Sequence, residues 1–383
     1  MNLKPIYQKG YNFDFLTENE GLALYQHAPL SELMALAHLI RLHKAPSYVT
    51  WQIDRSVCIT NVCISDCRHC SSHVKPDSSE AFITTLEEYV EKVEELLKYG
   101  GEQLILQSGL NPDLGLSFYK NLFQQLKELF PKIKLHALGP SEIAFIATQE
   151  GLTFSKVLEE LVDSGLDSLP GYGAEILCNR VRGELSPGKP NADAWLNVMR
   201  EAHKLNLPTS ATMMFGHFET PEERIQHLIK IRELQAEKPK GTYGFLVFMV
   251  WPMHYQLATR TGTMPVNIKL SALEYLRMVA ISRIMLPNIP NIQASWQYVG
   301  KELAQIALHA GANDFGSITI DDYANLHGSI AYRLDAYHIQ KAIVDAGFEP
   351  KLRNQKFEQI GLPDCEFSKI MLFEELRSAP YDM

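Results

Sequence analysis

The stretch CITNVCISDCRHCSSH, residues 58–73, places four cysteines and two histidines in one polar segment. The whole chain of 383 residues has six cysteines, so most of them lie here. The stretch follows SYVTWQID, which begins at Ser47 and whose apolar residues predict a β-strand. A loop with so many soft ligands directly after a strand favours a metal site, and the rest of the chain indicates which fold holds it.

Short apolar runs alternate with longer amphipathic runs along the chain. Eight candidate strands begin at Ser47, Gln103, Ile133, Leu166, Pro208, Tyr243, Asn291 and Asn313. Helices with capping signals are predicted between strands over residues 85–100, 220–235 and 271–285. This alternation predicts an α/β fold whose parallel strands close as a TIM-like barrel, with an open doubly wound sheet as the alternative.

The segments outside the predicted barrel have helical patterns. A helical stretch precedes the first strand, and the tail contains one clear helix, YHIQKAIVDAG from Tyr337. The chain has no low-complexity linker, so we expect one domain with extensions. The expected parts are an N-terminal helical extension over 1–46, a barrel over 47–317, and a C-terminal extension over 318–383 that packs on the barrel.

Composition narrows the class of protein. The net charge is −9, 46% of the residues are hydrophobic and no basic block is present, so we expect no nucleic-acid partner. The N-terminus lacks the apolar segment of a signal peptide, and no apolar run reaches the roughly 18 residues that span a bilayer. We therefore expect a cytoplasmic protein without membrane insertion, whose cysteines are thiols or metal ligands rather than disulfides.

Three cysteines of the opening stretch, Cys63, Cys67 and Cys70, follow a C-x3-C-x2-C pattern. Active sites of such barrels lie on the loops after the strands, where this loop stands. Three thiolates can hold three irons of a 4Fe–4S cluster and leave the fourth iron open. A structural zinc site is the alternative, although such sites usually pair two separated C-x2-C units. The fourth zinc ligand would be Cys58, His69 or His73. In the cluster interpretation, Cys58 is a small buried residue.

The cysteine spacing resembles that of the radical S-adenosylmethionine superfamily, in which the pattern follows the first barrel strand. GGE at residues 100–102 and TMMFGHFE at 212–219 resemble two further motifs of that superfamily, although GGE alone could be a helix C-cap. GLDSLPGYGAEIL, NIPNIQASW and LHAGANDFGS resemble its group that makes menaquinone by the futalosine route, and its deazaflavin-forming relatives. The resemblance covers nearly the whole chain and implies a 4Fe–4S cluster and S-adenosyl-L-methionine as cofactors.

The resemblance also implies a reaction. It indicates an oxidoreductase that cyclises the nucleoside dehypoxanthine futalosine, by hydrogen abstraction from ribose C4′ and radical addition to the benzoate ring. Aminofutalosine synthase and a deazaflavin-forming synthase are the alternatives within the superfamily. An electron donor such as flavodoxin or ferredoxin would be a partner. Two alternatives lie outside the superfamily. A zinc-stabilised barrel hydrolase would contain no iron or acid-labile sulfide, and a degenerate family member that acts as a binding protein would produce no deoxyadenosine.

Cofactor-side residues follow from motif positions and strand ends. GGE is expected at the amino group of S-adenosylmethionine, and Glu175 at its ribose hydroxyls unless it is a surface glutamate. Arg180 or Arg182 could bind a carboxylate through a bidentate fork. The expected cofactor-side residues are His69, Gly100, Gly101, Glu102, Gln107, Glu175, Arg180, Arg182 and Gly216.

On the substrate side, His217 is the candidate base for restoring aromaticity, because the ordinary pKa of histidine suits that task. His136 is alternatively a core histidine, and the tryptophans could be core residues. The expected substrate-side residues are Ser108, His136, Glu142, Trp251, Trp296, Asn313 and Asp314.

Several positions depart from the pattern of the resembled group. Relatives usually carry an aromatic residue at His69 and Ala-Phe at Ser71-Ser72, and Tyr172 interrupts a glycine run. The segments MVWPMHY, residues 249–255, and DDY, residues 321–323, also differ. These departures leave the cluster assignment unchanged, and they bear on the identity of the substrate and therefore on the specific reaction.

Overall fold

The computed structural model describes residues 1–70, 73–253, 270–318, 320 and 332–361. Ser71, Ser72, Cys365, the last two residues of the departing segment 249–255 and the whole of 321–323 lie outside these ranges. The strands are β1 (Tyr48–Gln52), β2 (Asp54–Cys58), β3 (Gln103–Gln107), β4 (Lys134–Ala137), β5 (Leu166–Ser168), β6 (Pro208–Phe215), β7 (Gly244–Pro252), β8 (Asn291–Gln293), β9 (Asp314–Ser317) and β10 (Glu349–Leu352).

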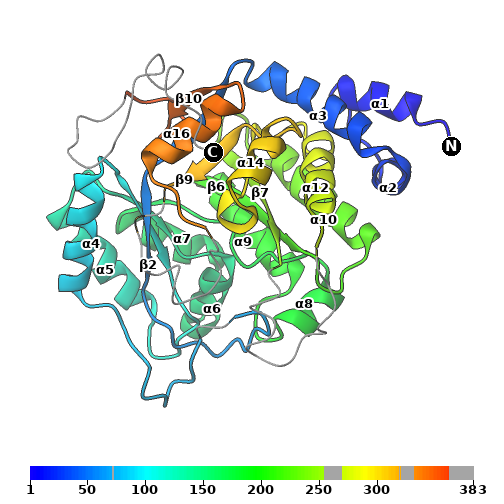
Figure 1. Ribbon diagram of the computed structural model, residues 1–383. Helices are drawn as coiled ribbons and strands as arrows, with labels where there is room; N and C mark the ends of the chain where they lie inside the picture. Colours follow the sequence, from blue (N-terminus) through cyan, green and yellow to red (C-terminus); the bar gives the residue numbers. More distant parts are fainter. Residues whose placement is uncertain (71–72, 254–269, 319, 321–331, 362–383) are drawn as a thin grey trace.

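The ladders between these strands are parallel and form two sheets, in the orders β10-β1-β9-β8-β7-β6 and β2-β3-β4-β5. The chain joins the sheets at Ile53, between β1 and β2. A parallel bridge between Leu169 and Thr209 links the ends of β5 and β6. The strands thus follow one another in the order expected for a barrel, with helices around them (Figure 1). The predicted α/β fold with parallel strands is confirmed.

Each of the eight predicted strands has a counterpart in the structure, but two strands were not predicted. The first strand continues as β2, so the chain stays extended from Tyr48 to Cys58 apart from Ile53. The tail contributes β10, which pairs with β1 at the edge of the six-stranded sheet. Pro350 lies within β10, and an edge strand tolerates proline because one side of its backbone needs no ladder partner.

The helices begin where the capping signals stand. Thr85 and Glu88 form the predicted capping box of α4, and Thr220 and Glu223 form that of α10. In α12 the Ser271 side chain accepts the hydrogen bond of a first-turn N–H. The helices on the barrel part are α4 (Leu86–Lys98), α5 (Leu116–Leu129), α6 (Pro140–Glu150), α7 (Phe154–Asp163), α8 (Asn179–Leu185), α9 (Ala192–Lys204), α10 (Pro221–Glu237), α12 (Ala272–Met285), α13 (Trp296–Val299), α14 (Lys301–Leu308) and α16 (Ala336–Asp345).

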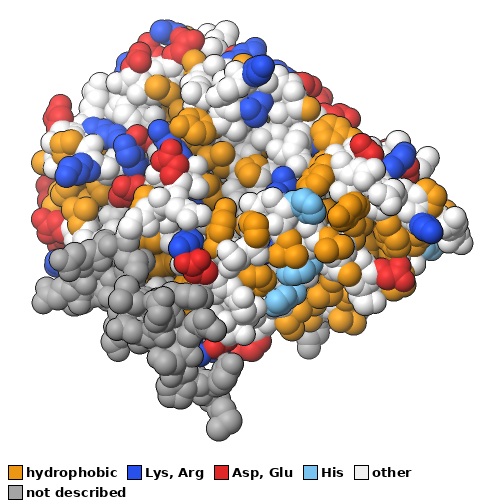
Figure 2. Space-filling view, turned by 90° about the horizontal axis from the view of Figure 1, so that it is seen from above, with side chains coloured by type: hydrophobic (Ala, Val, Ile, Leu, Met, Phe, Trp, Pro, Cys, Tyr) orange, Lys and Arg blue, Asp and Glu red, His pale blue; other side chains and the backbone are white. Residues whose placement is uncertain are grey.

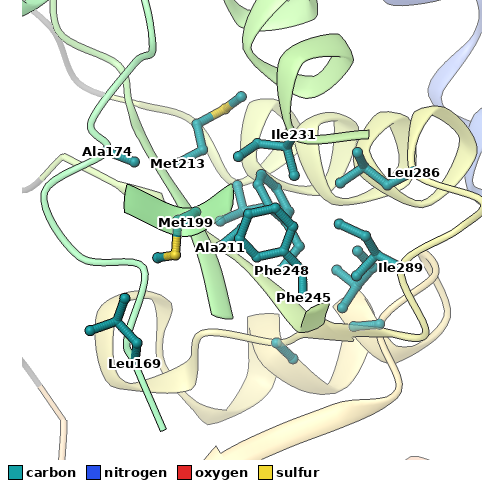
Figure 3. Close-up of a cluster of buried hydrophobic side chains, with 14 of the residues drawn as sticks. Leu169, Ala174, Met199, Ala211, Met213, Ile231, Phe245, Phe248, Leu286 and Ile289 are labelled. Atoms are coloured by element: carbon teal, nitrogen blue, oxygen red, sulfur yellow. The ribbon is translucent and has the colours of Figure 1, made fainter. Parts of the chain in front are cut away.

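Successive side chains of β6 point alternately towards the hydrophobic core outside the strands and towards the space that the strands surround. Ala211 and Met213 are buried with Phe245 and Phe248 of β7 between the strands and the surrounding helices (Figure 3). Thr212 and its inward-facing neighbours in β6 line a cavity instead. Burial of large side chains stabilises by roughly 1.5–3 kcal/mol each, so this outer layer holds the strands while the inner layer stays free for ligands.

Three helices precede β1, namely α1 (Lys4–Tyr11), α2 (Glu18–His27) and α3 (Leu30–Lys44). They pack on α10 and α12, at the right of Figure 1. The division at residues 46/47 and 317/318 stays a prediction. No helix in the described ranges is both long and apolar enough to cross a bilayer. On the face seen in Figure 2, basic and acidic side chains are intermixed rather than gathered by sign.

Candidate active site

A cavity of about 480 Å³ occupies the interior of the ring of strands. The cysteine loop after β2 lines one part of it, and inward-facing side chains of the strands line the rest. The segment after β10 also reaches it, with Arg353, Gln355 and Phe357. Because small-molecule sites usually measure about 300–1,000 Å³, the cavity has the size of a ligand site.

The three cysteines of the C-x3-C-x2-C pattern all line this cavity. Ser65 lies between two of them, since its Oγ is 3.0 Å from Cys63 Sγ and 3.3 Å from Cys67 Sγ. The loop is fixed where the backbone N–H of Cys63 donates to the carbonyl of Val74, and where that of Cys70 donates to the carbonyl of Cys67, at 3.0 and 3.1 Å. Three thiols around one shared space fit the donor set of a 4Fe–4S cluster with one open iron.

The other cysteines have different surroundings. Cys58 is buried, and its Sγ donates to the carbonyl of Thr60 at 3.2 Å, although it also lines the cavity. Cys178 donates to Glu223 at 3.1 Å and does not line the cavity. Among the residues that the structure describes, no three His, Cys, Asp or Glu side chains are arranged to hold a single metal ion. The assignment of ligands stays a prediction that rests on the spacing and the shared cavity.

The GGE segment lies elsewhere than expected. Gly100 ends α4, with φ +76°, and its N–H donates to the carbonyl of Leu97. Gly101 and Glu102 precede β3 and therefore lie at the opposite end of that strand from the cysteines. The expected contact of these three residues with the cofactor is wrong for this structure, because the motif is a helix C-cap at the start of the strand.

At the other end of β3, Gly109 and Leu110 line the cavity but were not among the predicted site residues. A Cβ on Gly109 would lie 2.1 Å from the carbonyl oxygen of Val62, and the N–H of Leu110 donates to Cys63 Sγ at 3.3 Å. Gln107 and Ser108 line the cavity beside it, as expected. The close backbone approach requires glycine, so SGL at residues 108–110 was the signal that could have located this contact.

Glu175 is a buried residue of the cavity wall with three basic side chains around its carboxylate. Its carboxylate is 3.1 Å from Arg182 Nη1, 2.8 Å from Lys189 Nζ and 3.7 Å from His69 Nε2. Burial by itself raises the pKa of this carboxyl, but Lys189 and Arg182 outweigh burial and lower the pKa to about 2. Burial also lowers the pKa of His69 to about 4, so its ring is neutral at neutral pH. Glu175 is therefore an ionised carboxylate inside the cavity.

The two arginines named with Glu175 differ in place. Arg182 is buried and donates to the carbonyls of Gly173, Ala174 and Pro190 as well as to Glu175, so it holds the backbone of this segment and does not line the cavity. Arg180 lies in the first turn of α8, where its side chain is exposed and pairs with Glu223 and Glu184. The expectation that Arg180 contacts the cofactor is wrong for this structure, because α8 turns it outward.

His217 does not reach the cavity either. Its Nε2 donates to the carbonyl of Met214 at 3.0 Å, and its Nδ1 lies 2.9 Å from Glu219. Gly216, with φ +91°, turns the chain back after β6, and Glu219 accepts from the N–H of Gly216 at 2.7 Å. The turn packs His217 beneath the strand end, so the structure does not place this candidate base at the cavity. Gly216 does not line the cavity, and its expected cofactor contact is not present in the structure.

The substrate-side residues divide into two groups. Ser108, His136, Glu142 and Trp251 line the cavity, and burial raises the pKa of the Glu142 carboxyl. Three others do not line it, namely Trp296, Asn313 and Asp314.

The three predicted residues that do not line the cavity contact other parts of the protein. Trp296 starts α13 and is 1% exposed in the core. Asp314 begins β9 and Asn313 precedes it, so both lie at the opposite end of the strand from the one expected. Asn313 accepts from Arg283 at 2.6 Å, and Asp314 accepts from Arg353 at 2.6 Å. Their predicted contact with substrate is therefore wrong for this structure.

Aromatic rings form one wall of the cavity. Trp251 stacks on Tyr298, with ring centroids 5.5 Å apart, and lies 5.6 Å from the ring of Tyr172. All three line the cavity, and the two tyrosines were missed as site residues. Such a wall favours a ligand with an aromatic part.

Comparison with known proteins agrees with this geometry. Residues 57–231 match the model of the radical SAM superfamily. Over 95% of its length the chain is 33% identical to the cyclic dehypoxanthine futalosine synthase of Streptomyces coelicolor, of which the match covers 90%. The chain therefore belongs to the radical SAM superfamily, whose enzymes bind a 4Fe–4S cluster and S-adenosylmethionine. Residues 242–365 match the model of the CofH/MqnC C-terminal region, so within the superfamily the chain resembles the proteins that share this region.

Two further similarities are informative. The chain is 35% identical over 90% of its length to a 5-amino-6-(D-ribitylamino)uracil–L-tyrosine 4-hydroxyphenyl transferase of Methanosarcina barkeri, of which the match also covers 90%. The crystal structure of HydG, a maturase of the [FeFe]-hydrogenase, superposes with a TM-score of 0.73 at 16% identity, covering 91% of this chain and 76% of that one. The fold is thus that of radical SAM enzymes, and the relatives named as synthases identify an enzyme that forms carbon–carbon bonds.

Proposed function

We propose that the protein cyclises dehypoxanthine futalosine to cyclic dehypoxanthine futalosine in menaquinone biosynthesis. The observation that carries the proposal is the match along 95% of the chain to a protein of that named activity. When bound, the cluster and S-adenosylmethionine supply a 5′-deoxyadenosyl radical that removes a hydrogen atom from the substrate. The residues of this chain then have to bind and orient the substrate and keep the site closed, because such a radical attacks any nearby C–H bond.

The cavity offers suitable places for both molecules. We infer that the cofactor occupies the part beside Cys63, Cys67 and Cys70, with Glu175 at its ribose hydroxyls, since an ionised carboxylate accepts such hydrogen bonds well. The nucleoside would lie deeper, with its benzoate ring against the wall of Trp251 and Tyr298. Holding ribose C4′ and the ring together makes the new bond an intramolecular event, so positioning sets the rate.

The test supplies the purified anaerobic holoenzyme with dehypoxanthine futalosine deuterated at C4′, S-adenosylmethionine and reduced flavodoxin or ferredoxin. We expect one deuterium in the released deoxyadenosine and a product two hydrogens lighter than unlabelled substrate. Deoxyadenosine without deuterium, and no cyclic product, would refute the proposal.

The transferase similarity supports a second candidate, the joining of a tyrosine-derived ring to a ribitylaminouracil. A parallel incubation with 5-amino-6-(D-ribitylamino)uracil and tyrosine decides between the two. A third incubation with the vinyl-ether substrate tests the aminofutalosine synthase alternative, in which the adenosyl group adds to the vinyl ether, becomes part of the product and leaves no free deoxyadenosine.

A further inference from the structure

Three residues distant in the sequence form a hydrogen-bonded chain in the cavity wall. His136 faces inward from β4, in register with Ser168 of β5. Its Nδ1 lies 2.6 Å from Ser168 Oγ, and Ser168 Oγ donates to Gln355 Oε1 at 3.1 Å. Gln355 comes from the segment after β10, and all three residues line the cavity. The function and the cofactor placement proposed above assign no role to this series of hydrogen bonds.

The direction of these hydrogen bonds fixes the protonation of the imidazole. The amide oxygen of Gln355 can only accept, so it takes the single hydroxyl proton of Ser168. Ser168 Oγ can then only accept from His136, which requires the hydrogen of the ring to sit on Nδ1. Burial and the charge of Arg353 lower the pKa of His136 to about 3, so the ring carries one hydrogen at neutral pH. Nε2 consequently presents a lone pair.

This lone pair has no hydrogen-bond partner among the described residues, and the ring that carries it lines the cavity. An acceptor that faces the cavity favours a ligand that brings a donor, because a bound ligand without a donor would cover this acceptor and leave it unpaired at a cost in free energy. A benzoate carboxylate brings only acceptors, whereas a sugar hydroxyl can donate.

We propose that His136 Nε2 accepts a hydrogen bond from a ribose hydroxyl of the nucleoside substrate, and that Ser168 and Gln355 are positioning residues that fix its tautomer. This inference rests on the proposed function. It implies that the C-terminal segment acts at the substrate site, since Gln355 sets the polarity of a histidine on β4. It also orients the nucleoside, with its sugar towards β4 and β5 and its aromatic ring towards Trp251.

The binding test uses the holoenzyme with dehypoxanthine futalosine and with derivatives that each lack one ribose hydroxyl. In the wild type we expect one derivative to bind about tenfold more weakly than the parent nucleoside. This difference should disappear in His136→Leu and remain in His136→Gln, whose amide oxygen can replace Nε2. Unchanged cluster content and S-adenosylmethionine affinity show that the variants are folded. The same hydroxyl penalty in His136→Leu as in the wild type would overturn the inference.

A second measurement needs no substrate. Nitrogen NMR of holoenzyme labelled in histidine distinguishes the two neutral tautomers, and comparison with His136→Gln assigns the signal. We expect hydrogen on Nδ1 in the wild type and a shift of the population towards Nε2 in Ser168→Ala and Gln355→Leu. Hydrogen on Nε2 in the wild type overturns the inference whatever the substrate is. A wild type that binds and turns over none of the nucleoside refutes the proposed function and this ligand together.

Discussion

Lys189 Nζ lies 2.8 Å from Glu175 Oε1, and both side chains line the cavity that the three cysteines share. Glu175 follows β5 and has φ +41°, while Lys189 stands on the turn between α8 and α9. A buried ion pair of this kind is sensitive to loss of one partner, because the other charge then stays unpaired. The pair therefore couples the integrity of the site to the stability of the protein.

Replacing Glu175 by Gln should weaken binding of S-adenosylmethionine by about tenfold or more, because hydrogen bonds to a charged group contribute about 1.5–3 kcal/mol. It should also destabilise the protein, since Lys189 and Arg182 lose their carboxylate. Anaerobic equilibrium dialysis and urea unfolding measure the two effects, and exposed Glu184→Gln in α8 is the matched control. Unchanged cofactor affinity with abolished turnover would instead assign Glu175 to the chemical step.

The cysteine assignment predicts a sharp division among single substitutions. Alanine at Cys63, Cys67 or Cys70 should prevent assembly of a full 4Fe–4S cluster, because each would supply one iron with its thiolate. Alanine at Cys58 or Cys178 should leave iron and acid-labile sulfide contents unchanged, since both lie outside the C-x3-C-x2-C pattern and their thiols donate to Thr60 and Glu223. Loss of the brown chromophore in Cys58→Ala, together with its retention in one of the three, would contradict the assignment.

Gly109→Ala should disrupt the cysteine loop. Its Cβ would lie 2.1 Å from the carbonyl oxygen of Val62 and 3.0 Å from Cys63 Cβ, and backbone cannot move aside cheaply. We expect a loss of about 1–3 kcal/mol of unfolding free energy, typical of overpacking, and a reduced cluster content. Gly183→Ala in α8 is the control, because nothing lies within 4 Å of its Cβ position. Equal behaviour of the two variants would show that the loop after β3 does not hold the cluster loop.

Two buried histidines away from the cavity predict a pH dependence of stability. Burial lowers the pKa of His203 and of His227 to about 3, below the ordinary value of 6.5. The unfolded chain then binds more protons than the folded one below pH 6.5, so stability falls as pH decreases from about 6.5 towards 3. Each histidine contributes at most about 1.4 kcal/mol per pH unit in that window.

Urea unfolding at pH 7, 6 and 5 measures this slope. We expect a shallower slope in His203→Gln than in the wild type, and an unchanged slope in His43→Gln, where the side chain is exposed. Parallel slopes in all three proteins would show that burial of His203 does not control the acid side of the stability curve.

Local signals predicted much of the fold. The strand at Pro208 and the capping box of Thr220 and Glu223 depend on neighbours in sequence, and both appear as expected. The strand β10 was missed, because its pairing with β1 is a contact between the two ends of the chain. Short alternating runs such as EPKL give too weak a pattern by themselves.

The site was harder to predict than the fold, for physical reasons. A motif match places a residue near a strand but does not say at which end, and GGE at Gly100 fell at the wrong one. It also does not fix side-chain direction, so His217 turned beneath β6 rather than inward. Lys189 and Gln355 belong to no recognised motif. The fold brings them to the cavity on loops from distant parts of the chain, and a local sequence pattern does not show that contact.

The pairing of Tyr48 with Glu349 bears on how the protein is made. Ribosomes add about 5–20 residues per second, so β1 emerges roughly 15–60 s before β10. During most of that interval β1 lacks both of its sheet neighbours, because β9 also emerges long after β1, and its exposed backbone groups can pair with another chain. Completion of the six-stranded sheet is thus a late event, and expression strategies that slow aggregation of nascent chains should raise the yield of protein competent to receive its cofactors.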